Sequence, residues 1–173
     1  ATNQTTNGVT VYGDVYGGSA LGTVNSDAND HTYVTMHKGT INGSLYGGGL
    51  GSTSVAANVN GAVTVTVNGG SVKKTSAAGS GGVYGANNIK GAPQSSVTVD
   101  IYGTDPAPAE GQYALHAVYG GGNQANYTYG NGYPTVTVHN CYNSIEYVYG
   151  GGNAAAVKTT NVTIWGGNVI GNV

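Results

Sequence analysis

The sequence has little charge. Asp, Glu, Lys and Arg together make up 7% of the 173 residues, whereas about 25% is usual for a globular domain. All five basic residues are lysines, and there is no arginine. The net charge of −2 supplies neither the basic surface that nucleic acid requires nor a polybasic patch for a membrane surface. We therefore expect no nucleic-acid partner.

Cysteine and long apolar runs are scarce as well. Cys141 is the one cysteine, which excludes an internal disulfide framework, and we interpret it as a small, partly buried thiol. No run of about 18 apolar residues occurs, so we expect no transmembrane span and no membrane insertion. The chain also begins without the apolar segment of a signal peptide, as a mature secreted segment would.

Motifs that carry catalytic or metal chemistry are missing too. There is no phosphate-binding Gly-x4-Gly-Lys-Ser/Thr, no His-Glu-x-x-His and no Cys-x-x-Cys. The best acidic cluster is Asp27, Asp30 and His31, which we interpret as a solvated turn rather than a cation site. Four further carboxylates lie in different repeats, where they form no pair for glycan cleavage: Asp100, Asp105, Glu110 and Glu146. We therefore expect no enzyme, no metal and no cofactor.

The sequence is rich in glycine and contains a motif that recurs along the chain. Glycine accounts for 32 residues. The motif Val-Tyr-Gly-Gly-Gly-Asn occupies Val148 to Asn153 and returns letter for letter at Val118 to Asn123. Altered copies begin at Val15, Leu45 and Val83, so that successive copies start 30 to 38 residues apart. This regular return indicates a repeat architecture.

Alternating Val/Thr runs precede the copies of this motif, and Val63 to Val67 is the cleanest of them. Alternating β-branched residues favour strands, in which successive side chains point to opposite faces. Two short strands that recur in fixed order about every 30 residues are typical of a solenoid. We therefore expect an all-β fold: a right-handed parallel β-helix of about five rungs, without significant helix. A glycine-rich β-sandwich is the structural alternative.

The repeats divide the chain simply. We assign residues 1–8 to a polar lead-in and residues 9–173 to a single solenoid domain. Two insertions, Lys73 to Gly82 and Thr104 to Glu110, interrupt the repeat.

In each copy of the motif, the pleat places the first residue inward and the tyrosine outward. The expected inward residues are Val15, Leu45, Val83, Val118 and Val148. The expected outward residues, which we call the tyrosine ladder, are Tyr16, Tyr46, Tyr84, Tyr119 and Tyr149. Their rings either stack on one another or form an aromatic face for sugar rings. A threonine column also faces outward, but other residues interrupt it, which argues against an ice-binding surface.

Neither end of the predicted domain carries an obvious polar cap. The end residues that we assign to assembly surfaces are Val9, Val11, Val162, Ile164 and Val173. Open solenoid ends expose apolar side chains and unpaired strand edges, so they normally need a cap. We therefore expect the array to continue or to stack beyond residue 173, with identical copies as partners.

The motif and the Val/Thr runs between Val118 and Val173 resemble the glycine-rich repeats of large adhesin-like surface proteins of gut and other bacteria. The resemblance implies secretion, a parallel β-helix and display at a cell surface, and it carries over no active site. We accordingly expect an extracellular structural protein, a stalk or filament-forming segment of a surface or matrix assembly. The alternative is an adhesin module that binds surface glycans through the tyrosine ladder. Four sequons matter only in a eukaryotic secretory route: Asn3, Asn42, Asn126 and Asn161.

Overall fold

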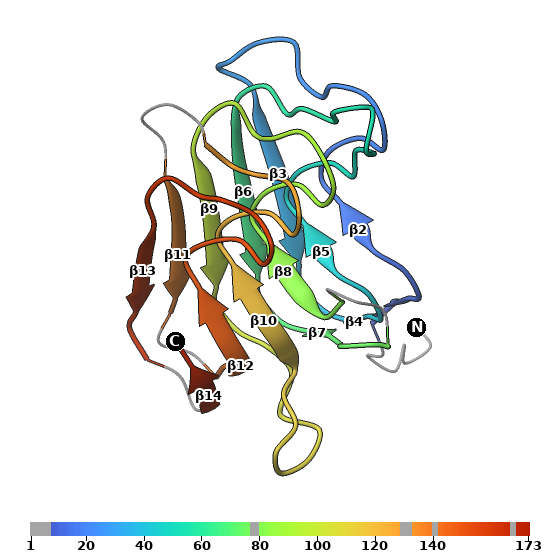
Figure 1. The fold of residues 1–173 in the computed structure, drawn as a ribbon. Coiled ribbons are helices and arrows are strands. Elements are labelled where there is room, and N and C mark those ends of the chain that lie inside the picture. The colour runs from blue at the N-terminus through green and yellow to red at the C-terminus, as the bar shows by residue number, and fades with distance from the viewer. Residues whose placement is uncertain (1–7, 77–79, 129–132, 140–141, 167–168) are drawn as a thin grey trace, which may run out of the picture.

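The structure, a computed structural model, describes residues 8–76, 80–128, 133–139, 142–166 and 169–173 (Figure 1). These residues form fourteen strands and no helix, which confirms the expected all-β class. The predicted lead-in lies outside the described residues except for Gly8, and so do Asn3 and Cys141.

The described strands form two sheets, in which every strand pair is parallel. The larger sheet has nine strands: β1 (Thr10–Val11), β2 (Val15–Tyr16), β4 (Thr40–Ile41), β5 (Leu45–Tyr46), β7 (Ser71–Val72), β8 (Gly82–Tyr84), β10 (Leu115–Tyr119), β12 (Ser144–Tyr149) and β14 (Val169–Asn172). The smaller sheet has five strands: β3 (His31–Met36), β6 (Ala62–Val67), β9 (Val97–Ile101), β11 (Pro134–Val138) and β13 (Asn161–Ile164).

The strands of the smaller sheet follow the order of the chain, with β3 and β13 at its two edges. Like residues consequently lie side by side. Val65 pairs with Val34 on one side and with Val99 on the other, and Val99 pairs in turn with Val136. The later five alternating runs are therefore successive neighbours in one sheet, whereas the first run contains β1 of the larger sheet.

The motif copies align in the larger sheet in the same way. The pairs of this row are Val15 with Leu45, Leu45 with Val83, Val83 with Val118, and Val118 with Val148. Isolated parallel bridges outside both sheets join Val24 with Val59, Val59 with Pro93, and Tyr127 with Val157. Equivalent segments of neighbouring repeats thus lie side by side at three places.

One aliphatic core receives side chains from both sheets. On β6, Val63, Val65 and Val67 are at most 1% exposed, while the threonines between them are half-buried. Burying a valine completely contributes about 1.5–3 kcal/mol. Leu45 and the later inward residues of the motif are buried as well, and Val15 packs against the core from a half-buried position. The inward direction predicted for these residues is confirmed.

Glycine after the motif tyrosine permits close approach of neighbouring repeats. A Cβ on Gly47 would lie 2.4 Å from the carbonyl oxygen of Gly85, and a Cβ on Gly85 would lie 2.4 Å from that of Gly120. No side chain fits at such a distance, so the backbones of adjacent copies can pack in this way only where this residue is glycine.

Candidate functional site

The tyrosine ladder exists as a continuous stack. The five rings follow one another with centroid distances of 4.9, 4.8, 4.6 and 5.0 Å and nearly parallel planes. These distances match the separation of neighbouring strands, about 4.8 Å, because each ring comes from the next strand in the row. Of the two interpretations of the ladder, mutual stacking is the one that the geometry supports.

Much of this stack is closed to solvent. Tyr46 and Tyr84 are only 2% and 1% exposed, whereas Tyr149 is 42% exposed. A small neighbour makes room for the ring of Tyr84, because a Cβ on Gly82 would lie 2.3 Å from that ring. The expectation of an exposed aromatic face is therefore wrong for Tyr46 and Tyr84.

Polar partners hold phenol groups of the ladder. Tyr16 donates a hydrogen bond of 2.9 Å to Asp14 and accepts one of 2.7 Å from the side-chain amide of Asn88. Burial raises the pKa of Tyr46 to about 12 and also raises the pKa of Tyr16 and Tyr84. The rings therefore stack as neutral phenols, without repulsion between phenolates.

An asparagine ladder, which our sequence prediction did not include, accompanies the tyrosines. Asn153 donates to Asn123 and Asn123 donates to Asn88, each through a bond of 2.9 Å between side-chain amides. All three are the sixth residue of a motif copy. That shared position was the available signal, since identical amides stacked at strand spacing can bond to one another.

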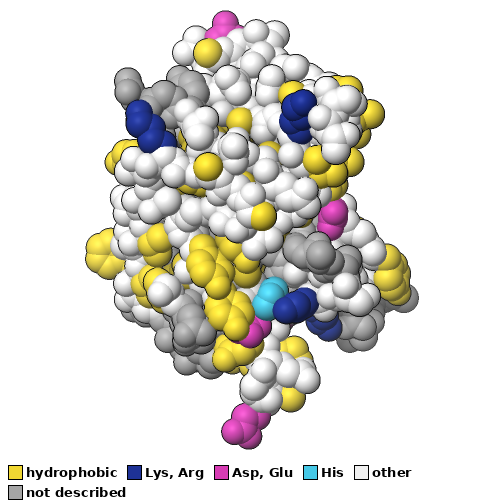
Figure 2. Space-filling view, in the orientation of Figure 1, with side chains coloured by type: hydrophobic (Ala, Val, Ile, Leu, Met, Phe, Trp, Pro, Cys, Tyr) yellow, Lys and Arg dark blue, Asp and Glu magenta, His cyan; other side chains and the backbone are white. Residues whose placement is uncertain are grey.

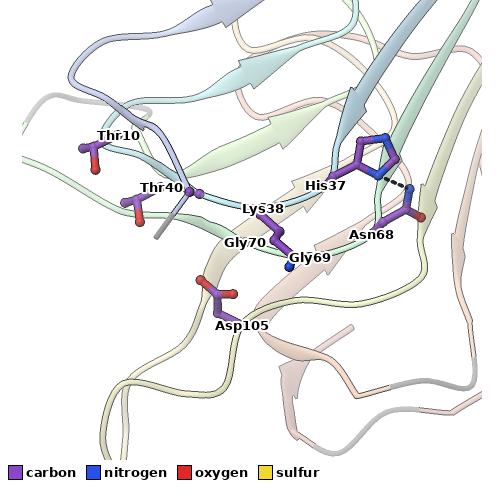
Figure 3. A pocket seen from close by; sticks show the side chains of 10 residues that line it. Thr10, His37, Lys38, Thr40, Asn68, Gly69, Gly70 and Asp105 are labelled. Atoms are coloured by element: carbon purple, nitrogen blue, oxygen red, sulfur yellow. Dashed lines mark hydrogen bonds between the residues drawn. The ribbon is translucent and has the colours of Figure 1, made fainter. Parts of the chain in front are cut away.

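A polar cavity of about 600 Å³ lies beside the ends of β3 and β6 (Figure 3). Its lining contains Asp105, which accepts a hydrogen bond of 2.9 Å from Ser71. At the other side in Figure 3, the side-chain amide of Asn68 lies 3.3 Å from Nδ1 of His37. Among the described residues of this lining, Lys38 is the one lysine and Asp105 the one carboxylate. The cavity therefore offers no pair of carboxylates for acid–base catalysis.

Two carboxylates from separate repeats each pair with a histidine. Glu146 Oε2 lies 2.6 Å from Nδ1 of His116, and Asp100 Oδ1 lies 3.0 Å from Nε2 of His139. The sequence did not reveal these pairs, since their members lie 30 and 39 residues apart. Within the described ranges, no three His, Cys, Asp or Glu side chains gather as a metal site.

The acidic loop before β3 is a turn that uses its own carboxylates. Asp30 accepts hydrogen bonds of 3.0 Å from the backbone N–H groups of Ser26 and Asp27, and Asp27 accepts one of 2.8 Å from that of Asn29. This geometry agrees with the interpretation of a solvated turn.

Apolar side chains remain accessible at the ends of the strand rows. Val9 is 78% exposed, Ile164 36% and Val173 75%, while Val11 and Val162 pack against the core from half-buried positions. Val9 and Val11 line a cavity of about 350 Å³, together with Val15, Val34 and Met36. The predicted assembly surfaces thus present apolar groups, and their contact with other copies stays a prediction.

Among the residues that the structure describes, no helix has the length and apolar character needed to cross a membrane. Comparison of the chain with protein-family models, with curated proteins and with solved structures yields no match.

Proposed function

We propose that this chain is an extracellular structural protein, a stalk or filament segment built as a right-handed parallel β-solenoid. The parallel pairing of equivalent strands from successive repeats supports the winding, because a parallel connection must bring the chain back to the same side. The bridges from Val24 to Val59 and on to Pro93 support one further row of contacts around each coil. Right-handed winding follows from the handedness of parallel crossovers.

The observation that carries the structural role is that the motif side chains contact one another. Tyr46 stacks between Tyr16 and Tyr84, and Asn123 bonds to Asn88 and Asn153. The most distinctive side chains of the repeat thus contact the same side chains of its neighbours. Such contacts hold successive repeats together along the axis of the array, as a stalk or filament requires.

Open strand edges support stacking of identical copies. The edge strands β3 and β13 provide backbone groups for pairing across such a junction.

Electron microscopy of the purified chain, together with sedimentation velocity, tests the filament form of this proposal. We expect ordered fibres, and we expect an Ile164→Lys variant to remain a folded monomer because a charge on an edge strand blocks pairing. Gln124→Lys, an exposed site away from the ends, serves as the control and should still assemble. If the unaltered chain is a stable monomer, it is not a filament subunit, and only the stalk form of the proposal remains.

Antibody labelling of intact source cells tests the extracellular location that both forms share. Labelling without permeabilisation is the expected result. Labelling only after permeabilisation contradicts the proposal as a whole.

A further inference from the structure

The two insertions that interrupt the repeat meet in space. Lys73 and Lys74 begin the first insertion, and Pro108 belongs to the second. These residues, together with Gln112 and Tyr113 just after the second insertion, line one cavity of about 310 Å³. In repeat proteins, insertions map to loops on one face, and that face is often the one that binds. The two insertions therefore mark this cavity as a candidate binding site.

A fixed carboxylate lies in the same cavity. His116 on β10 and Glu146 on β12 both line it, and their side chains meet at 2.6 Å. The neighbouring Glu146 carboxylate raises the pKa of the Tyr147 phenol. Glu146 is 32% exposed at its side chain, so its oxygens keep room for a ligand. A carboxylate held in place by His116 is preorganised to accept hydrogen bonds from hydroxyl groups.

Positive charge is in excess around this carboxylate. Lys73 and Lys74 are exposed, and neither takes part in the two histidine–carboxylate pairs. Among the described residues of the lining, there are two lysines and one carboxylate. A ligand that carries an anionic group complements this balance.

Aromatic rings lie beside the charged groups. The ring of Tyr147 meets that of His116 edge-on, with a centroid distance of 5.5 Å and an interplanar angle of 88°. Its centroid is also 5.9 Å from that of Tyr149, which is 42% exposed. Figure 2 shows hydrophobic side chains gathered next to a histidine, a lysine and an acidic side chain on the face where Figure 1 places β10 and β12. Tyr113 is the tyrosine of the described residues that lines this cavity, and Tyr147 contacts the cavity residue His116 from outside the lining.

We propose that this cavity binds a carboxylated sugar, such as a uronic acid residue of an acidic polysaccharide. The two lysines attract the sugar carboxylate, Glu146 and Gln112 bond its hydroxyl groups, and the ring of Tyr113 packs against its C–H face. The volume lies at the lower end of the range for ligand pockets, roughly 300–1,000 Å³, and suits one or two sugar residues. This binding function goes beyond the structural role and does not depend on it.

Titration with digalacturonate and with lactose, followed by NMR and calorimetry, tests the proposal. We expect saturable binding of digalacturonate that weakens with added salt, and much weaker binding of lactose. The double variant Lys73→Gln/Lys74→Gln should lose roughly fivefold or more in affinity, because two partly exposed charge contacts are removed. Both substitutions lie at exposed sites and should leave the thermal midpoint unchanged.

Matched variants separate this site from general attraction. Lys38→Gln/Lys90→Gln removes the same charge elsewhere and should leave binding of digalacturonate unaltered. Glu146→Gln and Tyr113→Ala should each weaken it. Absence of digalacturonate binding, equal binding of lactose, or equal losses from the two lysine pairs overturns the proposal. We expect all lysine variants to form filaments. A failure of the binding proposal is therefore distinguishable from a failure of the structural role.

Discussion

The side-chain amide of Asn153 donates a hydrogen bond of 2.9 Å to the side-chain oxygen of Asn123, which precedes it by 30 residues. Asn123 in turn donates to Asn88. The first two copies of the motif have Ala20 and Leu50 at the equivalent position, so the amide series ends at Asn88. There the phenol oxygen of Tyr16 accepts the next hydrogen bond. The asparagine ladder and the tyrosine ladder are therefore joined, and both connect repeats.

Asn123→Ala should lower the free energy of unfolding by about 2 kcal/mol, because it leaves the side-chain oxygen of Asn88 without a hydrogen bond. Asn88 is 8% exposed, so water replaces this lost partner poorly, whereas the amide of Asn153 is exposed to water. Denaturant unfolding of the purified variant measures the change. Gln124→Ala alters an exposed neighbour and should change stability little. Equal stabilities of the two variants would show that the ladder contributes nothing.

Gly82→Ala should destabilise the protein by about 1–3 kcal/mol through overpacking. The added Cβ would lie 2.3 Å from the ring of Tyr84, and this ring cannot move along the stack because Tyr46 and Tyr119 cover its two faces. We also expect altered near-ultraviolet circular dichroism from the tyrosines. Gly13→Ala is the matched control, since no atom lies within 4 Å of a Cβ there. A loss of stability as large in the control would contradict the explanation.

Stability should fall at alkaline pH as the tyrosines of the unfolded chain ionise. The pKa of Tyr46 is raised from 10.0 to about 12 by burial. The stabilisation by this group is fully present below the pKa of the unfolded chain and is lost as pH rises towards the folded value. Each such phenol lowers the free energy of unfolding by about 1.4 kcal/mol per pH unit in that window.

Tyr46→Phe should therefore reduce the steepness of the decline between pH 10.0 and about 12. Denaturant titrations across this window measure the slope. Tyr12→Phe changes a tyrosine that is 85% exposed and is the control. An identical slope in Tyr46→Phe and in the unaltered chain would mean that burial of this phenol has no part in the alkaline loss.

Local pattern was sufficient to predict the direction of most strand residues. Alternation between Val and Thr indicates which side chains enter the core, and Val65, which is 0% exposed, is one example. The burial of Tyr84 could not be obtained in this way, because the pleat alone indicates only that its ring lies opposite the core. Its burial depends on Gly82 beside it and on rings from two neighbouring strands.

Contacts between repeats required the register of the strands. His116 and Glu146 meet because Ala117 pairs with Tyr147, and the distance between them in the chain carries no sign of this. The isolated bridges outside the two sheets were likewise not predicted from the sequence, because single residues such as Pro93 form them and no strand pattern marks them. Composition and periodicity thus predicted the all-β class and the stack of tyrosines, while the histidine–carboxylate pairs emerged only from the pairing of the strands.

The register also predicts how two copies join. Thr35 pairs with Thr66, and this column continues through Asp100 and Thr137 to Thr163. If a second copy adds its β3 to β13, its Thr35 becomes the next residue of the column beside Thr163. Neighbouring strands are about 4.8 Å apart, which lies within the range of Cα separations that a disulfide spans.

A chain carrying Thr35→Cys and Thr163→Cys, with Cys141→Ser to remove the existing thiol, should therefore form disulfide-linked multimers on mild oxidation. Non-reducing electrophoresis would show a series of bands that reducing agent collapses. The matched control carries Tyr33→Cys with Thr163→Cys. Tyr33 belongs to the column that ends at Asn161 rather than Thr163, so its thiol is displaced by two residues, or about 6.8 Å along the strand. Equal cross-linking in both chains would point to random collision. Cross-linking in the control alone would indicate assembly in a different register.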